Sequence, residues 1–299
     1  MSLSSKIKVA VLRGGPSNEY DVSLKTGEQV LTLLREMPNT YEPVDIFISR
    51  DGEWHYGGLV QEPHQALRHV DVVWNALHGL YGEDGQVQRI LEGLQIPFTG
   101  SSAVASAISM NKDMAKKAYK LHSLNTPRHE LLEEGADNDD HLVFIFRNYL
   151  HPVIVKPANA SGSLGVSLVA TFHELKKAVK ETFQYSPRVL VEEFIKGDEV
   201  SCVVIEAAKG ERIYTLLPTG RLNVAENKSV EEMAKRAHEA LGLRHYSSSD
   251  FIVTPKRKIY ILETNSLPVL HEDSLMHSSL RATGWRFREF VDHVLKLAM

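Results

Sequence analysis

Two strand-like runs near the end of the chain carry the clearest chemical signature. If residues 255–258 form an even-length turn between them, residues whose numbers add up to 513 face each other, so Asp250 lies opposite Glu263. Strand alternation then puts Asn265 on the same face as Glu263. Two opposed carboxylates repel each other, and a hard cation with oxygen ligands offsets this. We predict that Asp250, Glu263 and Asn265 bind nucleotide-associated Mg²⁺, the alternative being a solvated edge with its charges fanned out.

A second feature is the stretch "HPVIVKPANASGSLGVSLV", which predicts a hairpin with small residues at its tip. Lys156 ends the first strand, and the tip carries almost no side-chain bulk. Small residues let backbone N–H groups approach an anion, and a lysine adds a point charge. The chain has no GxxxxGK[ST] run, so this is not a Walker loop. A flexible tip is the alternative, but the predicted metal site and Lys112 upstream favour a flap over nucleotide phosphates.

Further polar residues stand at the ends of apolar runs. In "VLVEEFIKGDEVS" we interpret Glu192 as an acceptor for an adenine amino group and Glu199, after a Gly-Asp turn, as a ribose ligand. Surface carboxylates are the alternative, which we favour for Glu193. His78 follows a strand and precedes a glycine turn, at the sheet edge where open α/β proteins collect ligands. A lone histidine is usually structural, yet this position favours a functional one.

Composition limits the class of protein. The chain has 299 residues, enough for two or three domains, with a net charge of −4 and therefore no basic footprint for nucleic acid. No apolar run approaches the length of a membrane span. The single cysteine, Cys202, lies in an apolar run and is predicted to be a buried structural thiol. We expect a cytoplasmic globular protein that needs no disulfides.

Hydrophobic periodicity predicts the elements that position these residues. Strands alternate with helices over about the first hundred residues, which indicates an open parallel α/β sheet. Two α+β modules follow, and we expect domains at 1–108, 109–188 and 189–299. Capping boxes predict helices after Thr171 and after Ser229, whereas the acidic stretch "LLEEGADNDDH" predicts an exposed loop.

Several of these stretches together resemble the D-alanine–D-alanine ligase family of the ATP-grasp superfamily. The most specific are "HGLYGEDG" and "KPANASGSLG", and the similarity runs nearly collinearly along the chain. The resemblance implies an ATP-grasp fold preceded by an N-terminal open parallel, Rossmann-like domain. It also implies a carboxylate–amine ligase of peptidoglycan synthesis that depends on ATP and on Mg²⁺ or Mn²⁺. Such a ligase phosphorylates the carboxylate of one D-alanine, and the amine of the second then attacks the acyl phosphate.

The resemblance also implies a role for each matching position. For the two amino acids, the ammonium ligands of the first would be Glu19 and His78, and the carboxylate ligands of the second would be Ser274 and Leu275. For ATP, the phosphate ligands would be Lys112, Lys156 and Ser163, and the adenosine ligands Glu192, Glu193, Ile195 and Glu199. The Mg²⁺ ligands would be Asp250, Glu263 and Asn265, in agreement with the hairpin geometry. Family members are usually dimers, so a homodimer is expected.

The chain departs from the family at the second-substrate site. "TGRLNVAENK" is too short to contain the family's long ω-loop, and Ser248 stands where the family has an oxyanion-stabilising arginine. Val269 replaces a glycine, and Gly162 replaces a serine of the phosphate loop. Another cation could substitute for the arginine, the candidates being Arg221, Lys228 and Arg244. Two alternatives therefore stay open: a ligase with a different second substrate, or a nucleotide-binding homologue without turnover.

Overall fold

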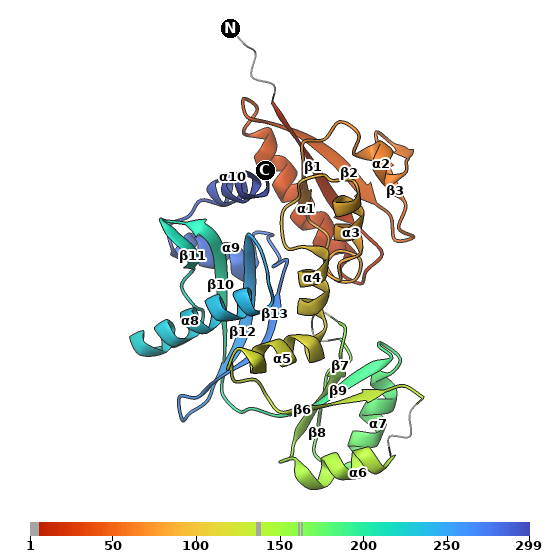
Figure 1. The fold of residues 1–299 in the computed structure, drawn as a ribbon, viewed down its shortest axis with the longest axis vertical. Helices are drawn as coiled ribbons and strands as arrows, with labels where there is room; N and C mark the ends of the chain where they lie inside the picture. Colours follow the sequence, from red (N-terminus) through yellow and green to blue (C-terminus); the bar gives the residue numbers. More distant parts are fainter. Residues whose placement is uncertain (1–5, 136–138, 161, 163) are drawn as a thin grey trace.

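The first sheet confirms the predicted open parallel α/β arrangement. The structure is a computed structural model that describes residues 6–135, 139–160, 162 and 164–299. The strand order is β4-β3-β2-β1-β5, with bounds β1 (Ile7–Gly14), β2 (Tyr41–Ile48), β3 (Trp54–Tyr56), β4 (Leu59–Val60) and β5 (Val72–Asn75). β1 pairs in parallel with β2 and β5, and β3 adds an antiparallel edge. Its helices are α1 (Tyr20–Arg35), α2 (Pro63–Ala66) and α3 (Gln86–Gly93) (Figure 1).

The second sheet forms the lobe at the bottom of Figure 1. Its order is β6-β9-β7-β8, with bounds β6 (His129–Glu133), β7 (Val153–Pro157), β8 (Ser167–Val169) and β9 (Arg188–Glu193). β7 and β8 pair antiparallel, which confirms the predicted hairpin. The helices are α6 (Asp139–Asn148) and α7 (Phe172–Thr182), and α7 begins with the predicted Thr171–Glu174 capping box. The loop predicted at residues 131–141 is wrong at both ends, because β6 extends to Glu133 and α6 begins at Asp139, and its residues 136–138 lie outside the described residues.

The third sheet is antiparallel and has the order β11-β10-β12-β13. Its strands are β10 (Asp198–Ala208), β11 (Glu211–Thr215), β12 (Tyr246–Val253) and β13 (Ile259–Asn265). The remaining helices are α4 (Ala103–Met110), α5 (Lys112–Leu121), α8 (Val224–Ala240), α9 (Leu275–Ala282) and α10 (Phe287–Ala298). α8 begins earlier than predicted: Asn223 caps it with Glu226, and Ser229 lies inside the helix, donating to the carbonyl of Ala225.

The last helix of the chain joins the first and third sheets. Trp74 of β5 packs with Tyr246 of β12 and Phe290 of α10. The Tyr41 hydroxyl donates to Asp292 of α10 at 2.8 Å. The second sheet instead has its own apolar core with α6 and α7. It also includes β9, so this lobe extends past the boundary predicted at residue 188.

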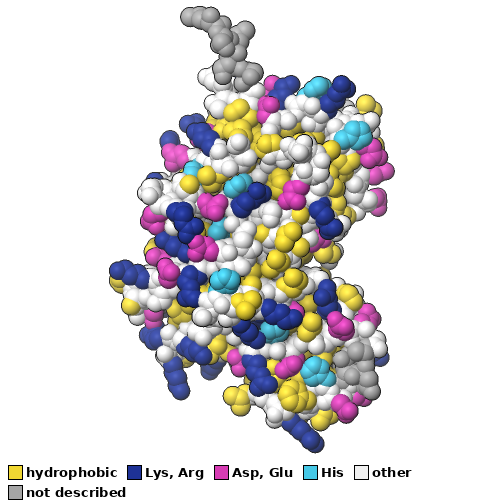
Figure 2. Space-filling view, in the orientation of Figure 1, with side chains coloured by type: hydrophobic (Ala, Val, Ile, Leu, Met, Phe, Trp, Pro, Cys, Tyr) yellow, Lys and Arg dark blue, Asp and Glu magenta, His cyan; other side chains and the backbone are white. Residues whose placement is uncertain are grey.

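The surface shows both signs of charge. Lys or Arg and Asp or Glu side chains are interspersed over the face drawn in Figure 2, as a net charge of −4 allows. Among the described residues, no helix is both long and apolar enough to cross a bilayer.

Candidate active site

The predicted metal ligands meet on one face of the β12–β13 ladder. Asp250 pairs with Glu263, and Ser248 pairs with Asn265. The predicted even-length turn is wrong, because Val253 pairs with Ile259 and the loop between them therefore has an odd number of residues. A bulge after Asp250 compensates for the odd loop and restores the predicted pairing.

Hydrogen bonds and burial set the charge of this pair. Ser201 of β10 donates to Asp250 at 2.5 Å, and Lys112 donates from Nζ to Glu263 at 2.6 Å and to the carbonyl of Ala160 at 2.8 Å. Burial, followed by the charge of Glu263, raises the pKa of Asp250 to about 6. Burial alone would raise the pKa of Glu263, but Lys112 brings it below its usual value. Two carboxylates and an amide oxygen beside one lysine fit a hard divalent cation.

Lys156 belongs to a buried charge cluster. Its Nζ donates to Oε1 of Glu192 at 2.5 Å, and the Nζ of Lys116 lies 2.9 Å from Oε2 of the same carboxylate. Although burial opposes ionisation, the two lysines lower the pKa of Glu192 to about 2, and burial lowers that of Lys116 to about 8. We did not predict Lys116, although it follows Lys112 by one helical turn and thus shares its face.

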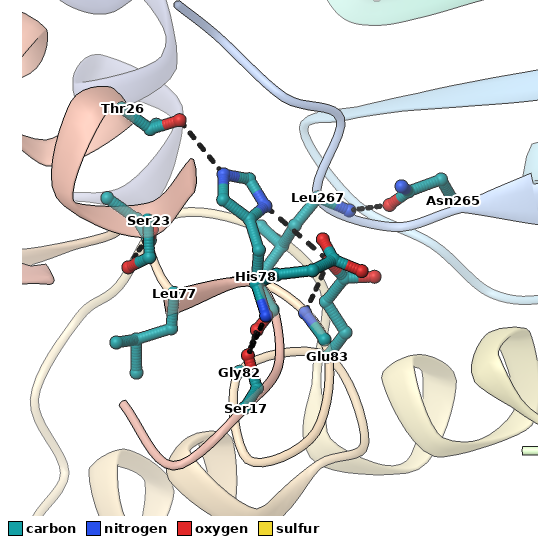
Figure 3. Close-up of polar contacts among 12 residues, drawn as sticks. Ser17, Ser23, Thr26, Leu77, His78, Gly82, Glu83, Asn265 and Leu267 are labelled. Atoms are coloured by element: carbon teal, nitrogen blue, oxygen red, sulfur yellow. Dashed lines mark hydrogen bonds and ion pairs between the residues drawn. The ribbon is translucent and has the colours of Figure 1, made fainter. Parts of the chain in front are cut away.

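His78 lies in a buried polar network at the carboxyl end of β5 (Figure 3). Its Nε2 shares a hydrogen bond of 3.0 Å with the Thr26 hydroxyl, and its carbonyl accepts from Ser17 at 2.6 Å. Its Nδ1 lies 3.5 Å from Glu83, which also accepts from the N–H of Gly79.

The same network draws in a second glutamate. Glu19, His78 and Glu83 each direct one polar atom into a group spanning no more than 4.8 Å. Burial raises the pKa of Glu83, against the lowering effect of His78. We did not predict Glu83, although it stands five residues after His78 in the glycine-rich run and the close spacing was a usable signal.

One cavity of about 910 Å³ lies where these groups converge. It is lined by six of the predicted residues: Glu19, Asp250, Glu263, Asn265, Ser274 and Leu275. His78 is buried behind this surface, and Lys112 reaches it through Glu263 and Ala160. Its walls come from the loop before α1, the β7–β8 flap, the β12–β13 face and the loop before α9.

The predicted adenosine ligands run from the end of β9, which holds Glu192 and Glu193, through Ile195 to Glu199 near the start of β10. Glu193 accepts from the N–H of Arg128 at 3.1 Å and so binds the edge of β6. Ile195 is half-buried, and Glu199 is exposed near the start of β10. None of these residues lines the cavity, and the predicted phosphate ligand Ser163 lies outside the described residues.

The segment that takes the place of the ω-loop is held against the third sheet. Residues 216–223 connect β11 to α8, and Thr219 exchanges hydrogen bonds with the backbone of Ser201 on β10. The three candidate cations lie elsewhere. Arg221 and Lys228 are exposed, and the Arg244 guanidinium lies over the ring of Phe98. No lysine or arginine of the described residues lines the cavity.

Cys202 confirms its prediction as a structural thiol. Its side chain is 1% exposed in the core between the third sheet and α8. Burial raises its pKa above the usual range, which disfavours the thiolate.

Comparisons with known proteins match this architecture. The family model described as D-ala D-ala ligase C-terminus matches residues 119–218 and 212–296, and the corresponding N-terminus model matches residues 58–101. D-alanine–D-alanine ligases of Geotalea uraniireducens (strain Rf4) and Geobacter sulfurreducens are 35% and 33% identical. These alignments cover 97% and 96% of this chain and 95% and 93% of the relatives.

Solved structures agree over nearly the whole chain. The D-alanine–D-alanine ligase from Coxiella burnetii has a TM-score of 0.88 at 24% identity, covering 99% of this chain and 94% of the other, which shows the fold. The VanG D-Ala:D-Ser ligase from Enterococcus faecalis has a TM-score of 0.87 at 26% identity, covering 99% and 100%.

Proposed function

This chain belongs to the D-alanine–D-alanine ligase family, and we propose that it is an ATP-dependent ligase that joins two D-alanine molecules for peptidoglycan synthesis. The observation that carries the proposal is one cavity, which the predicted metal ligands Asp250, Glu263 and Asn265 line together with Glu19 of the predicted amino-acid site. A carboxylate oxygen of the first D-alanine attacks the γ-phosphorus of ATP, which releases ADP. The amine of the second then attacks the acyl carbon, and phosphate and a proton leave.

Glu19 is proposed to bind the ammonium group of the first amino acid at the cavity wall, and His78, buried behind it, and Glu83 complete this site. A carboxylate attracts the ammonium group of an amino acid, and Glu19 supplies one at the cavity wall. The hydrogen bond between the Thr26 hydroxyl and Nε2 restricts the orientation of the His78 ring, and Nδ1 lies 3.5 Å from Glu83. This network keeps the first substrate in a defined place relative to the metal ligands.

The nucleotide lies along the flap and the β9–β10 segment. Lys112 and Lys156 neutralise phosphate charge, and Ser163 is proposed as a third phosphate ligand. The adenosine ligands are proposed to be Glu192, Glu193, Ile195 and Glu199. When bound by Asp250, Glu263 and Asn265, Mg²⁺ neutralises charge on the transferring phosphoryl group.

The second amino acid presents its carboxylate to Ser274, the N-cap of α9, and to the N–H of Leu275. An alternative exists for the identity of this second substrate. Ser248 lines the cavity where the family has an arginine, so a different second substrate is the alternative. One similar structure is itself named a D-Ala:D-Ser ligase.

Incubation with MgATP and D-alanine tests the proposal, with phosphate and dipeptide as readouts. Phosphate and D-alanyl-D-alanine are expected in equal amounts, and Lys156→Ala is expected to abolish both. Phosphate release with D-alanine that yields dipeptide only after addition of D-serine, a hydroxy acid or another amino acid would favour the alternative. If the wild type releases no ADP with any acceptor, the ligase proposal is rejected.

The surrounding organisation is also proposed. We retain three domains near 1–108, 109–188 and 189–299, with the second extended to include β9. We place the enzyme in the cytoplasm, where ATP is available, and expect a homodimer. Light scattering of the purified protein measures its mass against the 33.6 kDa of one chain.

A further inference from the structure

The end of the cavity proposed for the second amino acid is poor in positive charge. The cavity is lined by three carboxylates, Glu19, Asp250 and Glu263, and by no lysine or arginine of the described residues. Lys112 donates to Glu263 and to the carbonyl of Ala160. A substrate carboxylate needs N–H or O–H donors, and charged donors bind it more strongly than neutral ones. Ser274 and the first N–H groups of α9 are neutral donors only.

His271 is the described lining residue that can carry positive charge at this end. It lies in the loop between β13 and α9, three residues before Ser274, and both residues line the cavity. Within the described part of the chain, no hydrogen bond or ion pair holds its imidazole ring. An imidazole offers at least one N–H donor in either protonation state and a full charge when protonated.

The loop holds His271 in a defined place. Leu267 and Leu270 are both at most 2% exposed and anchor the loop in the apolar core shared with α9 and α10. The N–H of Ser274 donates to the carbonyl of His271 at 2.9 Å, closing a turn directly before α9. The ring and the helix N-terminus are therefore presented by one short, anchored segment.

We propose that His271 binds the carboxylate of the second amino acid, together with Ser274 and the N-terminus of α9, and so adds an imidazole N–H donor at a place where no lysine or arginine of the described residues lines the cavity. This inference rests on the proposed ligase function and assigns a substrate contact within it. The resemblance places only Ser274 and Leu275 at this carboxylate. Arg221, Lys228 and Arg244 do not line the cavity, whereas His271 does.

The test measures whether His271 and the substrate carboxylate depend on each other. The probes are a phosphinate analogue of D-alanyl-D-alanine and the same compound with its C-terminal carboxylate converted to an amide. Calorimetry with MgADP gives their affinities for wild type, His271→Ala and His277→Ala. His277→Ala controls for disturbance of the loop, since the ring of His277 packs against Phe287 and shares a hydrogen bond of 2.9 Å with the carbonyl of Glu272, next to His271, but does not line the cavity.

In the wild type, amidation is expected to weaken binding by about 10- to 100-fold, the effect of losing a hydrogen bond to a charged group. In His271→Ala the free acid binds about tenfold or more weakly, and most of the amidation effect disappears. His277→Ala is expected to show the same loss of affinity on amidation as the wild type. An amidation effect of equal size in wild type and His271→Ala overturns the inference, as does a wild type that binds neither compound.

Dipeptide synthesis is measured in parallel, so that the two proposals fail separately. If the wild type makes dipeptide but amidation weakens binding equally in wild type and His271→Ala, the proposed function stands and the role of His271 is rejected. A wild type that makes no dipeptide from D-alanine, but whose amidation effect depends on His271, keeps the carboxylate contact and rejects the proposed synthesis of D-alanyl-D-alanine.

Discussion

Glu263 lies directly opposite Asp250 across the β12–β13 ladder and accepts a hydrogen bond of 2.6 Å from Lys112. Two carboxylates and one ammonium leave this part of the cavity wall with excess negative charge. That charge, with the neighbouring amide of Asn265, is what a divalent cation would neutralise.

Removing either carboxylate is therefore expected to reduce turnover. Asp250→Asn and Glu263→Gln should each lower kcat by about 100-fold or more, because several kcal/mol of charge stabilisation are lost. The Mg²⁺ concentration for half-maximal rate should rise, and chelation of Mg²⁺ should abolish the wild-type rate. Glu211→Gln, an exposed substitution on β11 of the same sheet, is the control and should leave both parameters unchanged. A Mg²⁺ dependence identical in all four proteins would remove this assignment.

The buried cluster of Glu192 with Lys116 and Lys156 predicts an order of stabilities. Glu192→Gln leaves two buried lysines without a counter-charge and is expected to cost about 3–5 kcal/mol. Lys116→Met loses the contacts to Glu192 and Thr126 but leaves Glu192 paired with Lys156, so a smaller loss of about 1–3 kcal/mol is expected. Urea unfolding of both variants checks the order, which would be wrong if Lys116→Met were the less stable one.

Glu83 predicts opposite effects on binding and on stability. Burial raises its pKa, so the folded state penalises the ionised form at neutral pH. Glu83→Gln should therefore keep or increase the free energy of unfolding. The same change weakens the contact with His78 and should raise the KM for the first amino acid about tenfold. Kinetics and thermal unfolding together check this, and a loss of stability with unchanged KM would contradict it.

His245 predicts how stability depends on pH. Burial, followed by the charge of Arg244, lowers its pKa in the folded state to about 4 from the ordinary 6.5. The unfolded chain thus binds more protons below about pH 6.5, and stability falls as the pH drops from there toward about 4. The loss between pH 7.5 and pH 5 should be about 2 kcal/mol.

His245→Asn is the variant that isolates this effect. The residue has a φ of 66°, which asparagine tolerates, and its Nδ1 accepts from the N–H of Gly100, which an asparagine oxygen can also do. The free energy of unfolding of His245→Asn should change less between pH 7.5 and pH 5 than that of the wild type. If urea unfolding gives the same loss of unfolding free energy between pH 7.5 and pH 5 for the wild type and for His245→Asn, His245 is not the titrating group.

Much of the fold followed from local patterns. The parallel strands of the first sheet, the β7–β8 hairpin and the cap of α7 all confirm predictions drawn from neighbouring residues. The start of α8 was wrongly predicted because two residues offer the same capping signal. Ser229 and Asn223 both precede a glutamate at capping distance, and packing of Val230 and the residues around it left Asn223 as the cap.

The sequence by itself determined that residues 246–265 form a hairpin and that His78 follows a strand, because both depend on residues close together in the chain. The pairing of Asp250 with Glu263 also needed the bulge after Asp250, which strand alternation does not predict. Only the tertiary structure decided that Lys116 shares Glu192 with Lys156, that residues 216–223 lie against β10, and that His271 lines the cavity. The physical reason is the range of the interactions. Strand alternation acts between neighbours, whereas burial and charge pairing depend on which distant elements pack together.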